Sequence, residues 1–200
     1  MKSNGRQSRS YDMSKRASSA AETGRRILQA TLDLFMEGPL ANVTLAAVAE
    51  RADVTVQTVI RRFGDRVGLI NATAEYSSAN VASQRDAAPI GDIPAVVENL
   101  VEHYETFGAL ALKLLSEEDA SPVMAEITEA GRQYHRQWCA RVFAPFLEDL
   151  YRTDGDRRLA QLVALCDVYT WKLLRLDSGL SRDQVILSLL EMLEPFTRRP

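Results

Sequence analysis

Cysteine is scarce in this chain, which contains only Cys139 and Cys166 among its 200 residues. Two cysteines without a CxxC motif exclude the disulfide framework of a small secreted domain, so we expect a reducing compartment. Long apolar runs are absent too, because the most apolar stretch, residues 159–174, is interrupted by Asp167 and Lys172 and is too polar to span a bilayer. Residues 1–20 are basic and lack the apolar segment of a secretory signal. We therefore expect a cytoplasmic protein.

Motifs of catalysis are also missing. There is no glycine-rich phosphate loop, and neither His103 nor His135 stands in a recognisable nucleophile motif, so the sequence predicts neither an enzyme nor a cofactor. His135 and Cys139 are four residues apart and would share a helix face, which Cys166 could approach. A metal site needs three or four ligands, and a buried cysteine beside a hydrogen-bonded histidine is the commoner arrangement, so we predict no metal.

Period-two alternation is absent as well, and the apolar residues recur at helical spacing, so the sequence predicts an all-α fold of eight or nine helices. Residues 1–20, rich in Ser, Arg and Lys, are expected to form a disordered basic arm. Residues 21–81 and 82–200 are expected to form two helical domains. The predicted helices cover about 23–37, 44–52, 55–63, 66–85, 92–115, 121–151, 156–176 and 181–194.

Charge is distributed unevenly along the chain. Residues 1–70 carry eleven basic and seven acidic residues, whereas residues 71–200 carry thirteen and twenty. A basic first third on an acidic remainder favours a polyanionic partner at one end only, although splits of this size also arise by chance.

Two short helices joined by a tight turn occupy residues 43–63. At about 100° per residue, Val56, Val59, Ile60 and Phe63 form one apolar stripe, and the polar residues of that helix fall on the other side. This pattern predicts a helix-turn-helix, whose second helix enters the DNA major groove. The chemistry is suitable, because arginine pairs with guanine, glutamine with adenine, and threonine with a thymine methyl or a phosphate. The predicted DNA-binding residues are Thr44, Thr55, Gln57, Thr58, Arg61, Arg62 and Arg66.

Arg66 follows Gly64-Asp65 at the start of a helix, where a cation opposes the positive end of the helix dipole. Asp65, as the cap, offsets part of that cost. We expect a phosphate to bind between Arg66 and the free N–H groups of that helix end.

Residues from about Glu22 to Asn80 resemble the DNA-binding domain of the TetR family of bacterial transcription regulators. The resemblance rests on ILQATLDLFMEG (27–38), VTLAAVAERADVT (43–55) and TVIRRFGDRVGLI (58–70), and more loosely on DVYTWKLLRLDSGLS (167–181). The family pattern matches Thr44 at the start of the second helix, and Thr55, Gln57 and Thr58 in the recognition helix. It also matches Phe63, as the residue that anchors this helix in the core. Two positions depart from the family pattern: Ile60 replaces a phosphate-contacting tyrosine, and Arg66 replaces a lysine.

The family resemblance implies a C-terminal helical domain that forms a homodimer and encloses a small-molecule cavity. The sequence independently supports a dimer, because residues 159–176 are apolar on nearly every side and the last helix carries an apolar stripe. The alternative is a monomer whose own core uses all of this surface. The residues predicted at the dimer interface are Leu162, Leu173, Val185, Ile186, Leu189, Leu190 and Leu193. The residues predicted to line a ligand pocket are His103, Tyr104, Phe107, Met124, Tyr134, His135, Trp138, Tyr169 and Trp171.

The sequence therefore predicts a homodimeric, ligand-responsive repressor that binds a palindromic double-stranded DNA operator and an unidentified small-molecule effector. The alternative is an all-helical sensor or carrier of small molecules that does not bind DNA.

Overall fold

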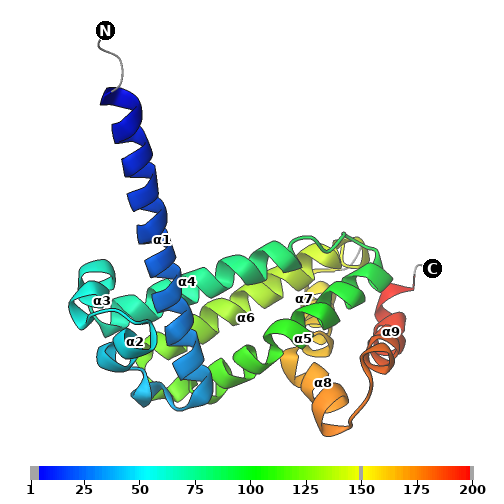
Figure 1. Cartoon of the computed structure of the whole chain (residues 1–200). Helices are drawn as coiled ribbons and strands as arrows, with labels where there is room; N and C mark the ends of the chain where they lie inside the picture. The colour runs from blue at the N-terminus through cyan, green and yellow to red at the C-terminus, as the bar shows by residue number, and fades with distance from the viewer. Residues whose placement is uncertain (1–4, 149–150, 199–200) are drawn as a thin grey trace. The chain divides into compact units, whose positions relative to one another are not determined.

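A computed structural model describes the backbone of residues 5–148 and 151–198 and the side chains of residues 18–148 and 151–198. The described backbone is built from helices and contains no strand, which confirms the all-α prediction (Figure 1). The helices are α1 (Gly5–Glu37), α2 (Leu45–Arg51), α3 (Val56–Phe63), α4 (Arg66–Arg85), α5 (Ile93–Ser116), α6 (Pro122–Val142), α7 (Arg152–Leu165), α8 (Val168–Lys172) and α9 (Arg182–Thr197). Shorter turns are η1 (Leu40–Asn42), η2 (Glu118–Ala120), η3 (Ala144–Phe146) and the π-helical η4 (Leu173–Asp177).

The chain divides into two compact units, Met1–Tyr76 and Ser77–Pro200, and α4 runs from the first into the second. Among the described residues, no helix is long and apolar enough to cross a membrane.

The first unit is built on α1, against which α2 packs, and α2 in turn packs against α3. Its core contains Ile27 and Phe35 of α1, Val48 of α2, Val59 of α3 and Leu69 of α4. The structure corrects the predicted disordered arm over residues 5–20, which lie in α1, whereas residues 1–4 of that arm lie outside the described residues. Between Gly5 and the end of α1 the sequence has no proline and only Gly24 as a weak helix former, so its polar residues extend the helix that the core anchors.

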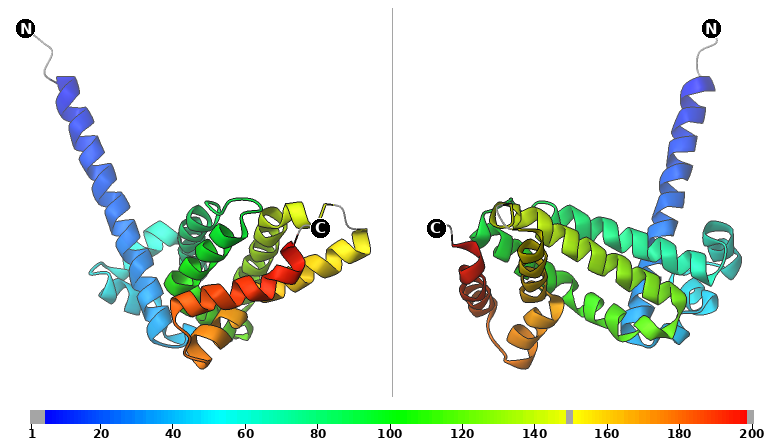
Figure 2. Two further views of the ribbon diagram at one scale, coloured as in Figure 1. Left: turned by 90° about the vertical axis from the view of Figure 1, so that its right-hand side faces the viewer. Right: turned by 180° about the vertical axis from the view of Figure 1, so that it is seen from behind.

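The second unit is organised around α5, which contacts α6, α8 and α9, while α7 packs against α6 and α9. Figure 2 shows α9 lying beside α7 and close to α8. The α5 side chains Val97 and Leu100 are fully buried in one apolar cluster with Trp138 of α6, Leu162 of α7 and Leu189 of α9. At about 25 cal/mol per Å² of apolar surface, burial of this kind is the main term that holds such a unit together.

Local signals fixed several of the predicted helix ends. Asp92, Ser121 and Ser181 accept hydrogen bonds from the backbone N–H groups of the first turns of α5, α6 and α9, and Ser181 with Gln184 forms the predicted capping box.

Two predicted helices are shorter or broken. The predicted helix 121–151 ends at Val142, because Pro145 cannot donate the backbone hydrogen bond that would continue it. The predicted helix 156–176 is divided at Cys166-Asp167, where the Asp167 carboxylate accepts from the N–H of Tyr169 at 2.9 Å and starts α8. The predicted break at Thr153-Asp154-Gly155 instead lies within α7.

Candidate nucleic-acid interface and ligand site

Two threonines fix the residues at which α2 and α3 start. The Thr44 hydroxyl oxygen accepts from the N–H of Ala47 at 3.1 Å, and that of Thr55 accepts from the N–H of Thr58 at 3.2 Å. Each bond satisfies a backbone donor that a helix start leaves free, an effect worth about 1 kcal/mol. The two caps set where both short helices begin.

The turn between the two helices has an unusual backbone conformation at Asp53, whose φ is 51°. Left-handed backbone costs most residues about 1–2 kcal/mol, and aspartate tolerates it better than other residues with a side chain, except asparagine. This conformation reverses the chain so that α3 packs against α2.

The exposed side of α3 is set by Val59, its only buried residue. At about 100° per residue, Gln57 and Arg61 point opposite Val59, and both are exposed. Within the described part of the chain, neither side chain makes a hydrogen bond or ion pair. The predicted apolar stripe is partly wrong, because Val56 and Ile60 are 39% and 38% exposed. They flank Gln57 and Arg61 because so short a helix meets α2 through only a narrow face.

Thr58 and Arg62 lie towards the sides of α3. The Thr58 hydroxyl is 2.9 Å from that of Thr55, so it takes part in the helix cap. The Arg62 guanidinium donates to the backbone oxygen of Ala20 in α1 and lies over Gly24, where an added Cβ would be 3.0 Å from its Nε. Both side chains are thus engaged within the unit, unlike Gln57 and Arg61.

Arg66 has partners that the sequence did not indicate. Its Nε donates to the oxygen of Val43 at 2.7 Å, and its Nη2 donates to the oxygen of Leu40 at 2.5 Å. These bonds tie the start of α4 to the turn before α2 and explain why a cation is tolerated at a helix N-terminus. A phosphate contact through the remaining amino group of Arg66 stays a prediction.

The start of α4 is also close to the end of α3. Asp65 caps α4 by accepting from the N–H of Gly68 at 2.8 Å, as predicted. A Cβ at Gly68 would lie 2.1 Å from the Phe63 backbone oxygen, so only glycine fits there. On the other side, both oxygens of Glu37 accept from Arg51 at 2.8 and 2.7 Å, which joins the end of α1 to α2 and lowers the pKa of Glu37.

In the second unit, most of the predicted pocket residues gather in one buried cluster. His103, Tyr104, His135, Trp138 and Trp171 are all less than a tenth exposed. The ring centroids of His103 and Tyr104 are 5.0 Å apart, those of Tyr104 and Trp171 are 5.8 Å apart, and those of His135 and Trp138 are 6.3 Å apart. Phe107, half-buried, borders the cluster at 5.4 Å from the His103 ring.

The other predicted pocket residues lie outside this cluster. Tyr169 is 52% exposed, which argues against a pocket role, because its place just after the α8 cap turns it to the surface. Tyr134 is half-buried and donates to Asp86 at 3.1 Å. Met124 is buried, but it is not part of the apolar core that includes Tyr104, Trp138 and Trp171.

Sequence reasoning missed Arg85, the last residue of α4, which is only 3% exposed. Its guanidinium carbon lies 4.0 Å from the centroid of the Trp138 ring, and its Nη2 is 3.3 Å from Nδ1 of His135. Burial and the charge of Arg85 lower the pKa of His103 to about 3, so His103 is neutral at pH 7. The only sequence signal was that Arg85 follows Val81 by four residues and shares its helix face.

The two cysteines lie beside the same cluster. The Cys139 sulfur is 3.8 Å from Nε2 of His135. A hydrogen bond with the Cys166 thiol lowers the pKa of the Cys139 thiol, whereas burial opposes that shift. Among the described residues there is no group of three or more His, Cys, Asp or Glu side chains that could hold a metal ion.

The predicted dimer interface needs correction. Leu162, Val185, Leu189 and Leu193 are at most 1% exposed within a single chain, because they pack into the core around α5, so their side chains have no surface to offer a partner. Ile186 and Leu190 are half-buried, and Leu173 is 58% exposed. The exposed apolar residues of α8, η4 and α9 are Tyr169, Leu173, Leu176, Leu187 and Met192.

Comparisons with known proteins agree with this architecture. The family model described as bacterial regulatory proteins, tetR family, matches residues 27–73, which contain α2, the turn and α3. The transcriptional repressor KstR of Rhodococcus jostii is 28% identical over 190 residues, 90% of this chain and 86% of that protein. The transcriptional regulator BetI of Burkholderia cenocepacia is 27% identical over 155 residues, 71% of this chain and 77% of that protein.

A crystal structure of a transcriptional regulator from Rhodococcus sp. Rha1 shares the fold, with a TM-score of 0.66 and 16% identity, over 88% of this chain and 99% of that chain. The predicted family resemblance is confirmed. Because that family consists of DNA-binding regulators and not of enzymes, the alternative of a small-molecule carrier without DNA binding is set aside. The helix-turn-helix of residues 27–73 therefore belongs to the tetR family of bacterial regulatory proteins, and over most of its length the chain is similar to transcriptional regulators.

Proposed function

We propose that the chain is a repressor that acts as a homodimer, with each α3 in the major groove of one half of a palindromic operator. The observation that carries this proposal is the exposed face of α3, where Gln57 and Arg61 point away from the buried Val59 and have no partner among the described residues. Arginine pairs with guanine and glutamine with adenine, and the exposed Val56 and Ile60 beside them suit thymine methyl groups. Repression is the activity in the name of the relative KstR.

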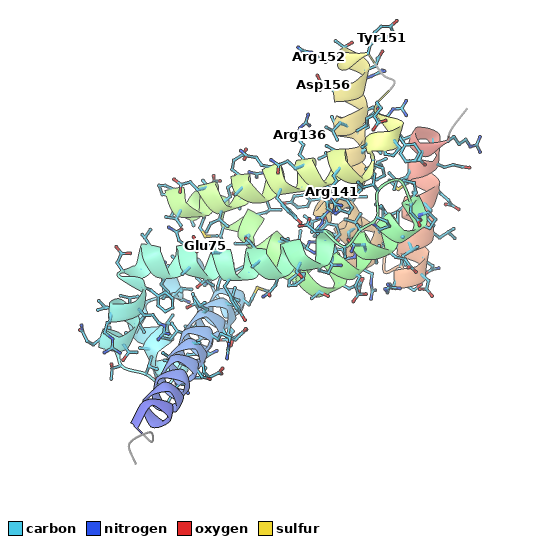
Figure 3. The ribbon with its side chains drawn as sticks, turned by 90° about the horizontal axis from the view of Figure 1, so that it is seen from above. Glu75, Arg136, Arg141, Tyr151, Arg152 and Asp156 are labelled. Carbon is cyan, nitrogen blue, oxygen red and sulfur yellow. The ribbon has the colours of Figure 1, made fainter. Side chains whose placement is uncertain are left out.

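The first test concerns Arg61. Duplexes selected from a randomised pool by the unaltered protein would be used in mobility-shift titrations at several salt concentrations. Arg61→Ala should weaken binding to the selected duplex about 5- to 150-fold and reduce its preference over unrelated DNA, because one bidentate base contact is worth about 1–3 kcal/mol. Arg136→Ala is the matched control, because Arg136 is an exposed arginine on α6 (Figure 3). Equal binding by the Arg61 variant and the parent would refute the assignment of this face.

We propose that the dimer forms through the exposed apolar residues of α8, η4 and α9. Tyr169 and Leu173 are spaced i and i+4, so they share one face, and the π-helical η4, which carries Leu176, packs against α9, which exposes Leu187. Isolated apolar side chains are normal on a protein surface, but a contiguous group at the end of a bundle supports self-association. A dimer would present two recognition helices about 34 Å apart, one turn of DNA.

A charge placed on this face tests the dimer. Leu173→Glu should convert the dimer to a monomer in sedimentation velocity, and the monomer should lose affinity for the palindromic duplex. Ile90→Glu is the matched control, because Ile90 is also 58% exposed but lies between α4 and α5. An unaltered protein that sediments as a monomer, or a Leu173→Glu protein that still sediments as a dimer, would contradict this interface.

We further propose that a small molecule in the second unit controls DNA affinity, by binding the conformations that hold the operator more weakly. The support is the buried group of aromatic and polar side chains around Tyr104 and Trp138, which has the composition of a ligand site. Because the operator is DNA inside the cell, the protein would act in the cytoplasm.

A further inference from the structure

Arg85 is a buried cation without a carboxylate partner in the part of the chain that the structure describes. It is 3% exposed, and among the residues that the structure describes it forms no ion pair. Its Nε is buried and has no acceptor among the described side chains and backbone. Arginine stays protonated in proteins, so this charge cannot be removed by loss of a proton, and an unpaired buried charge is costly.

The protein compensates the charge of Arg85 only in part. The Trp138 ring contributes a cation–π contact at 4.0 Å, His135 approaches one amino group at 3.3 Å, and the C-terminal end of α4 carries partial negative charge. Trp138 Nε1 and Arg141 donate to the backbone oxygen of Arg85 rather than to its side chain, at 2.9 and 3.2 Å. None of these groups supplies an acceptor for Nε.

The nearby carboxylates are engaged elsewhere. Asp86 is exposed, accepts from Tyr134 at 3.1 Å and lies 3.7 Å from Arg141. On α5, Glu105 accepts from Arg175 at 2.9 Å, and Glu102 lies 3.5 Å from Arg182. Asp167 accepts from the N–H of Tyr169 as the cap of α8. The negative partner of Arg85 is therefore not one of these side chains.

His103 is a second buried polar group without a partner. It is 5% exposed, and its Nδ1 has no hydrogen bond to any residue that the structure describes. His103 and Arg85 both border Tyr104, at 5.0 Å between ring centroids and 5.9 Å from guanidinium carbon to ring centroid. Neutral histidine can still donate one hydrogen bond. Two unpartnered polar groups thus flank one ring in the interior of the second unit.

We propose that this cluster binds an organic carboxylate, whose anionic group is held by Arg85 and His103 and whose apolar body lies against the surrounding rings. The planar guanidinium matches the two oxygens of a carboxylate. A phosphate dianion would require more donors than one arginine and one neutral imidazole. Tyr104, Phe107, Trp138 and Trp171 offer the apolar contacts, and the half-buried Phe107 brings the cluster to the surface of the unit. The inference deepens the proposed effector control by naming the chemical class of the effector.

Binding can be measured without DNA, because Trp138 and Trp171 are the only two tryptophans and both border the cluster. The probes are phenylacetate, phenylbutyrate, octanoate and decanoate, each compared with its neutral amide. At least one acid should change the tryptophan emission saturably and raise the melting temperature of the protein. Its amide should bind at least about tenfold more weakly, because a hydrogen bond to a charged group is worth about 1.5–3 kcal/mol.

Arg85→Met should weaken binding of that acid by at least about tenfold. Arg136→Met, which removes an exposed arginine from α6, should bind it like the parent. Circular dichroism would check that the Arg85 variant is folded. If it is not, the comparison of acid and amide on the unaltered chain decides alone.

The proposal fails if none of the acids binds, if acids and amides bind equally, or if a folded Arg85→Met protein binds the acid like the parent. These outcomes are separate from the DNA-binding proposal, because Arg61→Ala should leave acid binding unchanged and Arg85→Met should still shift the selected duplex. If the unaltered protein does not bind DNA, the proposed regulatory role is wrong, but the proposed carboxylate site is unaffected.

Discussion

Acid should destabilise the second unit through His103. This side chain is 5% exposed and faces the permanent charge of Arg85, with His135 nearby, so burial and both neighbours lower its pKa from 6.5 to about 3. Between those two values the unfolded chain binds a proton that the folded chain does not. Stability from this residue is therefore fully present above pH 6.5 and is lost as the pH falls towards 3.

The size of the effect follows from the two pKa values. At a pH one and a half units below the unfolded pKa, the unfolded state gains about 2 kcal/mol relative to the folded state, and at pH 7 it gains almost nothing. The free energy of unfolding should thus fall by about 2 kcal/mol between pH 7 and pH 5, a large share of the 5–15 kcal/mol typical of a folded protein. His103→Leu removes the titrating group and should remove this part of the pH dependence.

The assay is urea unfolding followed by tryptophan emission, because both tryptophans lie in the second unit. Parent and His103→Leu are compared at both pH values and at one protein concentration. Other groups titrate in this range, among them the Cys139 thiol, whose pKa is also lowered. They contribute equally to both proteins, so only the difference between the two pH dependences is assigned to His103. If parent and variant lose the same free energy between pH 7 and pH 5, His103 is not held neutral by its surroundings.

Substitutions at three positions test other parts of the fold by urea unfolding or thermal denaturation. Asp53→Val should be less stable than Asp53→Gly by about 1–2 kcal/mol, because the backbone at this residue is left-handed; equal stability would show that the turn relaxes. Thr55→Ala should cost about 1 kcal/mol by removing the α3 cap, and Thr55→Ser should not. Gly108→Ala should cost about 1–3 kcal/mol, because its Cβ would lie 2.6 Å from the buried Trp171 ring; an unchanged melting temperature would mean that the ring has room to move.

Local chemistry explains what could be predicted from the sequence. Thr44, Thr55, Ser121 and Ser181 start helices because a side-chain oxygen satisfies a nearby backbone donor, and that interaction spans only three residues. The same applies to the exposed side of α3, since helical spacing alone places Gln57 opposite Val59. Such features need no knowledge of the tertiary structure.

Tertiary partners explain what could not be predicted. The apolar faces of α7 and α9 were recognised, but spacing cannot tell whether the chain's own α5 or a second copy covers Leu162 and Leu189. The sequence did not indicate the carbonyl partners of Arg66, and the helical spacing from Val81 was the only sign that Arg85 is buried. In both cases the partners of the arginine side chain come from segments that are distant in the sequence.

The burial of both thiols makes the protein suitable for labelling at one chosen position. Cys139 and Cys166 are the only cysteines, and neither reaches solvent in the folded chain. A maleimide added under native conditions should therefore react only with a cysteine introduced on the surface. Spin labels attached at residue 57 in each copy of a dimer would report the distance between the two recognition helices directly, with and without an added acid.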